Sequence, residues 1–166
     1  MSMRFLIPLF GLLTLALPAT AFELEAWGGA SHSTQGQSLA IPHQIQPRGA
    51  LGYRDRIQED TTWGIEVSSV LHASESYRQF TLLVPFGVEM VSGPVFSLET
   101  RLGPGIATAP AIVFDGLSSD IYWMPTLHGS LISAWQLTPG FDLALRLVSE
   151  HLVTLSVDAG LQFTFD

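Results

Sequence analysis

The chain has 166 residues and carries 7 Lys+Arg against 15 Asp+Glu, which gives a formal net charge of -8. A negative chain is a poor partner for nucleic acid, because binding phosphates needs a basic face. The lack of cysteine excludes a disulfide scaffold and a thiolate zinc site, and a chain that is 47% hydrophobic and only 13% charged is too apolar to stay disordered.

The first predicted element is a secretory signal in residues 1–21. Arg4 supplies an early positive charge, Phe5 to Pro18 is an apolar run, and Ala19-Thr20-Ala21 offers small residues for cleavage. The apolar run is shorter than the roughly 20 residues that a membrane-spanning helix needs. We therefore predict a cleaved signal peptide over residues 1–21 and one mature domain over residues 22–166.

After residue 21, apolar residues recur with a period of two, which indicates β-strands rather than helices. Turn-forming residues such as Ser92-Gly93-Pro94 and Thr138-Pro139-Gly140 separate the strands. The pattern predicts eight strands, over Phe22–Ser31, Pro47–Arg54, Thr61–His72, Tyr77–Val88, Val95–Leu102, Tyr122–Trp135, Gly140–Ser149 and Ser156–Phe165. Each of them has one apolar face and one more polar face.

Two architectures produce this pattern. A soluble barrel or sandwich buries the apolar face, whereas an outer-membrane barrel turns it toward lipid. The polar faces are mostly Ser, Thr, Gly and Gln with isolated charges, and a soluble β-protein usually exposes many more charged residues. Composition therefore favours the membrane barrel.

Aromatic residues lie where a membrane barrel needs them. Trp123 and Trp135 share one face and lie twelve positions apart, which spans roughly 30 Å at 3.3 Å per residue and a tilt near 40°. Outer-membrane barrels carry aromatic girdles at both rims of an apolar band of about 25 Å. The predicted girdle comprises Trp123, Trp135, Phe141, Phe163 and Phe165.

The predicted connections differ between the two ends of the barrel. At one end, His32–Gln46 and Gly103–Ile121 are long, and Ala73–Ser76 is short. At the other end, Asp55–Asp60, Glu89–Pro94 and Gln136–Pro139 are all short, as periplasmic turns are in outer-membrane barrels. The apolar segment Gly103–Ile121 is expected to fold over the barrel mouth, to extend the strands, or to dock a partner or lipid.

The chain ends on an alternating strand, Leu161 to Phe165, followed by Asp166. This ending resembles the C-terminal strand that the barrel assembly machinery reads in outer-membrane proteins. Across the mature domain, the architecture resembles small eight-stranded barrels such as the transmembrane domain of OmpA. The resemblance implies an all-β fold, an antiparallel up-and-down transmembrane barrel located in the outer membrane of a Gram-negative cell envelope.

In such a barrel the polar face lines a lumen that side chains just fill. Opposite charges buried there must pair. Five inward charges are expected to form a lumen cluster: Glu66, Glu99, Arg101, Arg146 and Asp158. The predicted role is structural, interaction-based or that of a narrow, porin-like pore with a plugged polar lumen; the other interpretation of the cluster is a proton or ion path gated by rearranging its pairs.

One constellation has the parts of a catalytic triad. His128 and Ser130 share a face, and Asp142 lies on the same face of the next strand, so a base, a nucleophile and an orienting carboxylate are present. The pair resembles the His-x-Ser-Asn motif of outer-membrane lipid A deacylases, with Leu131 in the place of the Asn and Asp142 in the place of a later Glu. The resemblance implies an ester hydrolase acting on lipid A, as an alternative to a protein that is not an enzyme.

A third alternative is a soluble periplasmic, lipocalin-like barrel that binds an apolar ligand. The sequence predicts no cofactor and no metal site. The expected partners are outer-membrane lipid and lipopolysaccharide, together with the barrel assembly machinery through the C-terminal strand, and no nucleic acid.

Overall fold

The computed structural model describes residues 22–33, 45–72, 77–113, 116–150 and 154–165. The predicted signal peptide lies outside the described residues, as do most of the predicted connection His32–Gln46, the connection Ala73–Ser76, and Asp166. Within the described part of the chain, no helix is long and apolar enough to cross a membrane.

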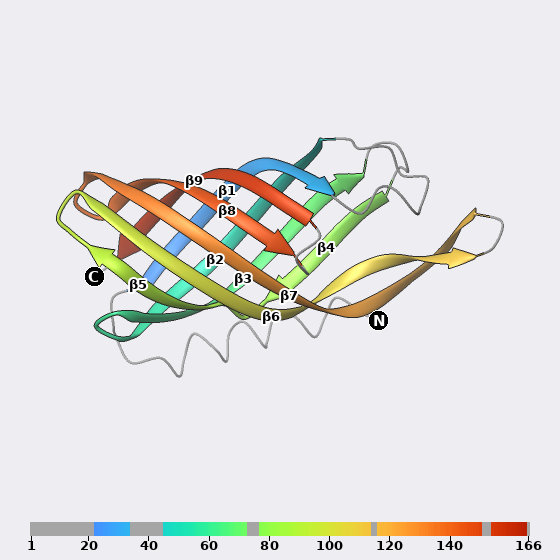
Figure 1. Cartoon of the computed structure of the whole chain (residues 1–166), viewed down its shortest axis with the longest axis horizontal. Coiled ribbons are helices and arrows are strands. Elements are labelled where there is room, and N and C mark those ends of the chain that lie inside the picture. Colours follow the sequence, from blue (N-terminus) through green and yellow to red (C-terminus); the bar gives the residue numbers. More distant parts are fainter. Residues whose placement is uncertain (1–21, 34–44, 73–76, 114–115, 151–153, 166) are drawn as a thin grey trace.

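Strand segments form one antiparallel sheet that closes on itself (Figure 1). They are β1 (Phe22–Ser33), β2 (Gln46–Gln58), β3 (Thr61–His72), β4 (Tyr77–Leu83), β5 (Phe86–Ser92), β6 (Phe96–Val113), β7 (Gly116–Thr138), β8 (Phe141–Glu150) and β9 (Thr154–Phe165). Because β4 and β5 both pair with β3 on one side and β6 on the other, they are two halves of one barrel strand. β1 pairs with both β2 and β9, which closes an eight-stranded barrel and confirms the predicted fold class.

The predicted strand Tyr77–Val88 is interrupted at one point in the wall. Pro85 has no N–H to donate to a ladder, and it separates β4 from β5. Backbone bonds cross the break, since Val84 N–H donates to Pro104 O at 3.0 Å and Gly64 N–H donates to Pro85 O at 2.9 Å. The wall is therefore continuous.

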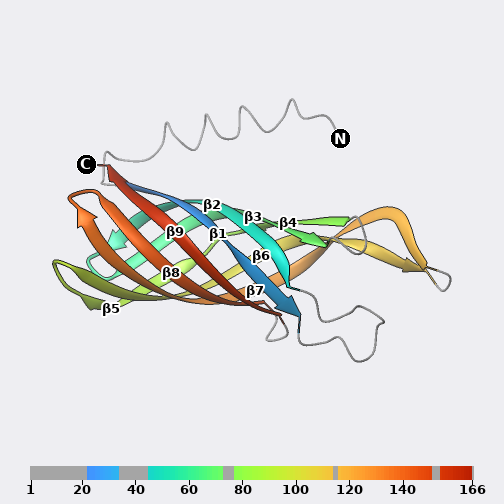
Figure 2. The ribbon, with the colours of Figure 1, turned by 90° about the horizontal axis from the view of Figure 1, so that it is seen from above.

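The two ends of the barrel differ (Figures 1 and 2). At the end where β1 begins and β9 ends, short turns join β2 to β3, β5 to β6 and β7 to β8; we call it the turn end, and the opposite end the loop end. The turn between β7 and β8 contains Gly140, whose φ of 78° is in the left-handed region that glycine adopts without strain.

The prediction that Gly103–Ile121 is a connection between strands is wrong, and the alternative that this segment extends the strands is confirmed. β6 continues to Val113 and β7 begins at Gly116, so this segment extends the strands. Beyond Ala107 on β6 and His128 on β7, the last residues that pair with β4 and β8, the two strands pair only with each other. They project from the loop end as a hairpin (Figures 1 and 2).

Strand β6 runs through two prolines of this segment, Pro104 and Pro110. Pro104 lies opposite the break at Pro85, where a strand ladder is already interrupted. Pro110 lies at an irregularity in the β6–β7 register, between Pro110 and Ile112. A proline at a break or a bulge removes no ladder bond that the sheet requires, and the strand continues past both of them.

Candidate functional site in the barrel lumen

Alternation along the strands turns apolar side chains outward and polar side chains into the lumen. On β8, Leu143, Leu145 and Leu147 are exposed, while Arg146 between them is buried. The buried charged side chains are Glu25, Arg48, Asp55, Glu66, Glu99, Arg101, Arg146, Glu150 and Asp158. A soluble protein has the opposite arrangement, so the exposed apolar band fits lipid rather than water.

Three of these charges lie toward the turn end with the half-buried Glu23 and Arg54; we call Glu23, Glu25, Arg54, Glu99 and Arg101 the turn-end cluster. Arg101 donates to both carboxylate oxygens of Glu25, at 2.7 and 2.8 Å, and to Glu99 at 2.8 Å. Arg54 pairs with Glu23 and Glu99. Thr62 and Gln162 donate further hydrogen bonds to Glu99 and Glu25. The buried carboxylates of Glu25 and Glu99 are thus each held from several strands, which charge burial requires.

A second group lies deeper along the barrel; we call Arg48, Glu66, Arg146, Glu150 and Asp158 the loop-end cluster. Arg146 donates to Asp158 from Nε at 3.1 Å and Nη2 at 2.8 Å, and it also pairs with Glu66. Arg48 donates to Asp158 at 3.1 Å and lies 3.5 Å from Glu66 and 3.9 Å from Glu150. Like the first cluster, this one sets two arginines against three carboxylates.

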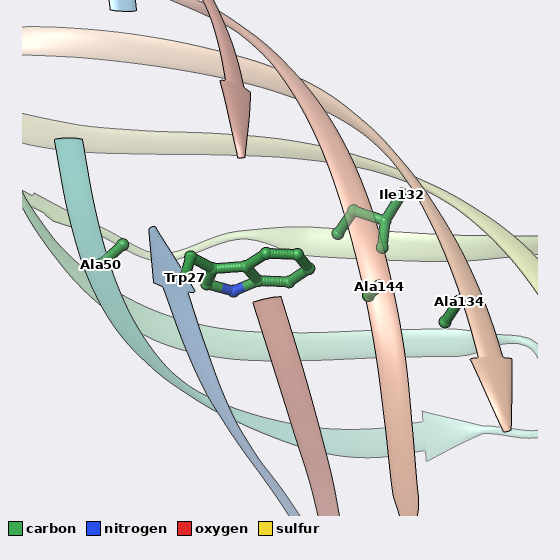
Figure 3. Packing of buried hydrophobic residues seen from close by; sticks show 5 residues of the cluster. All are labelled: Trp27, Ala50, Ile132, Ala134 and Ala144. Carbon is green, nitrogen blue, oxygen red and sulfur yellow. The ribbon is translucent and has the colours of Figure 1, made fainter. Parts of the chain in front are cut away.

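Trp27 lies between the two clusters and contacts both. Its Nε1–H donates to Glu25 at 3.3 Å, and the guanidinium of Arg146 lies 4.3 Å from its ring centroid, a cation–π distance. Figure 3 shows the indole reaching across the lumen between Ala50 on one side and Ile132, Ala134 and Ala144 on the other. The ionic clusters and the aromatic ring form one connected set of buried side chains.

The cavities inside the barrel differ in volume between the turn end and the middle of the lumen. At the turn end, an open cavity of about 580 Å³ is lined by Glu23, Arg54, Gln136, Asp142 and Thr164, among others. Deeper in the lumen, beside Arg101, His128, Ser130 and Arg146, a cavity measures about 10 Å³. That volume holds about one water molecule.

All five charges of the predicted lumen cluster face the lumen, but they divide between two clusters. Glu99 and Arg101 belong to the turn-end cluster, and Glu66, Arg146 and Asp158 belong to the loop-end cluster. Among the described residues, no group of three or more His, Asp or Glu side chains is arranged to hold a metal ion.

The structure does not bring the three residues of the predicted triad together. Asp142 pairs with Gln136, six positions along β7 from Ser130, which is roughly 20 Å at about 3.3 Å per residue. His128 instead lies beside Glu150, with Nε2 3.6 Å from Oε1, and Ser130 lines the same small cavity as His128. A space for about one water does not admit an acyl ester. Catalysis by His128 and Ser130 stays a prediction.

Aromatic side chains form a belt around the turn end. The ring contacts are Phe22 with Phe165 and Tyr53, Tyr53 with Trp63, Phe96 with Trp135, and Phe141 with Phe163, at centroid distances from 5.0 to 6.2 Å. Four of the five predicted girdle residues, Trp135, Phe141, Phe163 and Phe165, lie in this belt. Trp123 is exposed at the base of the projecting hairpin, so it lies toward the loop end.

Sequence reasoning missed Trp27, Arg48, Arg54 and Glu150 as lumen residues. For Arg48 and Arg54 the sequence does contain a signal, because residues an even number of positions apart on a strand share a face. Arg48 and Arg54 are separated by an even number of positions, as are Ala50 and Gly52, so one inward face runs through all four. Even spacing along a strand does not determine which arginine pairs with which carboxylate across the lumen.

The close packing of Trp27 against Gly160 allows a direct test of how the lumen is packed. A Cβ on Gly160 would lie 2.3 Å from Cε3 of Trp27 and 2.6 Å from the Ala26 carbonyl oxygen. We expect Gly160→Ala to lower the free energy of unfolding by about 1–3 kcal/mol, the usual effect of overpacking, as measured by urea titration of the folded barrel. Gly28→Ala is the matched control, because a Cβ there meets nothing within 4 Å. Equal losses in the two variants would contradict the packing described here.

The amino-acid sequence matches no family model and no curated protein. Solved structures do match. Neisserial surface protein A is 12% identical with a TM-score of 0.68, covering 87% of this chain and 99% of that one. The N-terminal β-barrel domain of Pseudomonas aeruginosa OprF is 12% identical with a TM-score of 0.63, covering 88% and 98%. The outer membrane enzyme PagL is 13% identical with a lower TM-score of 0.55, covering 85% and 98%. This chain has the fold of the small eight-stranded outer-membrane β-barrels.

Proposed function

We propose that this protein resides in a Gram-negative outer membrane as a barrel with a closed lumen, and that its role is structural or interaction-based rather than transport. The observation that carries the proposal is the connected set formed by the turn-end cluster, Trp27 and the loop-end cluster. The secretory signal predicted in residues 1–21 supports delivery to the cell envelope. The alternating C-terminal strand fits recognition by the barrel assembly machinery.

The energetics of the ion pairs favour closure. An ion crossing the lumen has to pass Arg101 and Arg146, each of which is paired with two carboxylates. Separating a buried pair leaves charges unpaired at low dielectric, which is strongly unfavourable. Trp27 adds a bulky apolar side chain between the two clusters. Thermal motion is therefore not expected to open a steady path.

Conductance across planar bilayers tests this proposal. We expect the refolded protein in concentrated KCl to show no stable ohmic conductance. Trp27→Ala removes the ring between the clusters and is expected to produce brief conductance events. Trp135→Ala, which removes an indole from the outer belt, is the matched control and is expected to stay silent. Long-lived open steps in the unsubstituted protein would contradict a closed lumen.

The projecting β6–β7 hairpin is the element best placed for an interaction role. It extends past the last residues that pair with β4 and β8, and at its base the Thr108 hydroxyl accepts from Phe80 N–H of β4 at 2.8 Å. We expect that replacing residues 110–121 with a two-residue turn between Ala109 and Tyr122 leaves the urea midpoint of the barrel unchanged, because the described residues of that range pair only with each other. A large loss of stability on shortening would show that the hairpin belongs to the barrel's folding unit instead.

A further inference from the structure

The outer wall carries a groove of about 460 Å³. Strand pairing places its central residues in one row, because Phe86 pairs with Leu102, Leu102 with Gly129, Gly129 with Ser149, and Ser149 with Leu155. We call this the Gly129 groove. Leu131 and Leu147, in the adjacent row, form one bank of it.

The groove exists because one position in this row has no side chain and its neighbour has a small one. Gly129 and Ser149 lie between Leu102 and Leu155, in a row that also holds Phe86. Neither packing nor backbone conformation requires the glycine. A Cβ on Gly129 meets nothing within 4 Å, and Gly140 is the only described glycine with a positive φ. The result is open space on a lipid-facing surface.

The row runs obliquely across the apolar band, from Leu155 near the boundary at the loop end to Gly129 nearer the middle of the band. Leu155 lies ten positions from Phe165 of the aromatic belt, Ser149 lies eight from Phe141, and Gly129 lies six from Trp135. A band of about 25 Å corresponds to roughly ten positions of a strand tilted near 40°. The groove thus opens near the boundary and runs inward, as the acyl chain of a lipid in that leaflet does.

We propose that the Gly129 groove binds one acyl chain of a membrane lipid from the leaflet at the loop end. The groove is continuous with the exposed apolar wall at Leu131 and Leu147, and its lining is dominated by these two residues with Phe86, Leu102 and Leu155. An unfilled space there forfeits van der Waals contacts, and hydrocarbon is what surrounds it. The Ser149 hydroxyl, close to the boundary, is placed to donate to a carbonyl where the chain joins its headgroup.

Photolabelling in vesicles tests this inference, which rests on the proposed membrane location. The refolded protein is placed in phosphatidylcholine vesicles that contain a small fraction of a phosphatidylcholine with a diazirine in its acyl chain, irradiated, and mapped by mass spectrometry. We expect the groove residues to be labelled at least about threefold more than Leu51 and Leu145, which are exposed elsewhere on the wall. Gly129→Leu fills the groove and is expected to remove this excess, whereas Gly28→Leu, at another outward glycine with free space, is expected to keep it.

Each other result overturns a defined part of the account. Uniform labelling around the wall, or an excess that survives Gly129→Leu, contradicts the groove but not the membrane location. No labelling at any wall residue contradicts the membrane location itself. Groove residues that are labelled less than Leu51 and Leu145 at high protein-to-lipid ratio, but not at low ratio, would identify a second copy of this chain as the occupant. If Gly129→Leu does not fold, as judged by mobility on unheated gels, Ser149→Leu fills the same row and carries the same expectation.

Discussion

Replacing Arg146 with leucine is expected to lower the free energy of unfolding by about 3–5 kcal/mol, which is the usual effect of removing one partner from a buried ion pair. Arg146 is buried and donates to Asp158 and pairs with Glu66, so its loss leaves two buried carboxylates without their main cation. The substitution also removes the cation–π contact with Trp27. Urea titration of the folded barrel in detergent, followed by tryptophan fluorescence, measures the change.

Arg56→Leu is the matched control for this experiment. The Arg56 side chain is 49% exposed and forms a salt bridge to Glu89 at 3.4 Å. Exposed pairs of this kind contribute about 0–1 kcal/mol, so we expect little change. The double variant Arg146→Leu with Asp158→Leu should recover part of the loss, because it removes the unpaired charge as well. An Arg146→Leu barrel as stable as the Arg56→Leu barrel would contradict the loop-end cluster.

An arginine in place of Leu145 is expected to destabilise the barrel by about 2–4 kcal/mol in lipid vesicles, the effect of a cation near the bilayer midplane. Leu145 is 47% exposed on β8, four positions from the belt residue Phe141. Its side chain lies in the exposed apolar band and has no acidic neighbour in its row, where it pairs with Ser133 and Ala159. The free energy of unfolding in vesicles measures the change.

Leu137→Arg provides the comparison at the edge of the band. Leu137 is exposed near the turn between β7 and β8, where a charged group reaches the interface and the expected loss is about 0–1 kcal/mol. A barrel standing in water would tolerate both substitutions equally well. Equal effects at Leu145 and Leu137 would therefore contradict a lipid-facing wall.

The fold could be predicted because alternation is a local property of the chain. Leu143, Leu145 and Leu147 share a face whatever their partners are, and so do Asp142, Ala144 and Arg146. Aromatic residues near strand ends, such as Trp135 and Phe163, marked one rim of the band for the same reason. The outward direction of the leucines could be predicted from composition, because the chain has too few charged residues to cover the surface of a soluble protein.

The pairing inside the lumen could not be predicted, because it depends on strand stagger. Arg101 meets Glu25 across 76 positions of sequence, and Arg48 meets Asp158 across 110. The same stagger separates Asp142 from Ser130, although β7 and β8 are neighbours. Residues that alternate in the same phase face the lumen together, but they do not have to lie at the same depth in the barrel. A catalytic triad needs the same face and the same depth.

Membrane extraction followed by an SDS gel of unheated and heated samples tests the central claim most directly. The account predicts that the protein stays with the membranes through a urea wash, is released only by detergent, and migrates differently before and after heating because the closed barrel survives in SDS until it is boiled. Recovery in the soluble periplasmic fraction, with one mobility under both conditions, would contradict a lipid-embedded barrel with its charges inside.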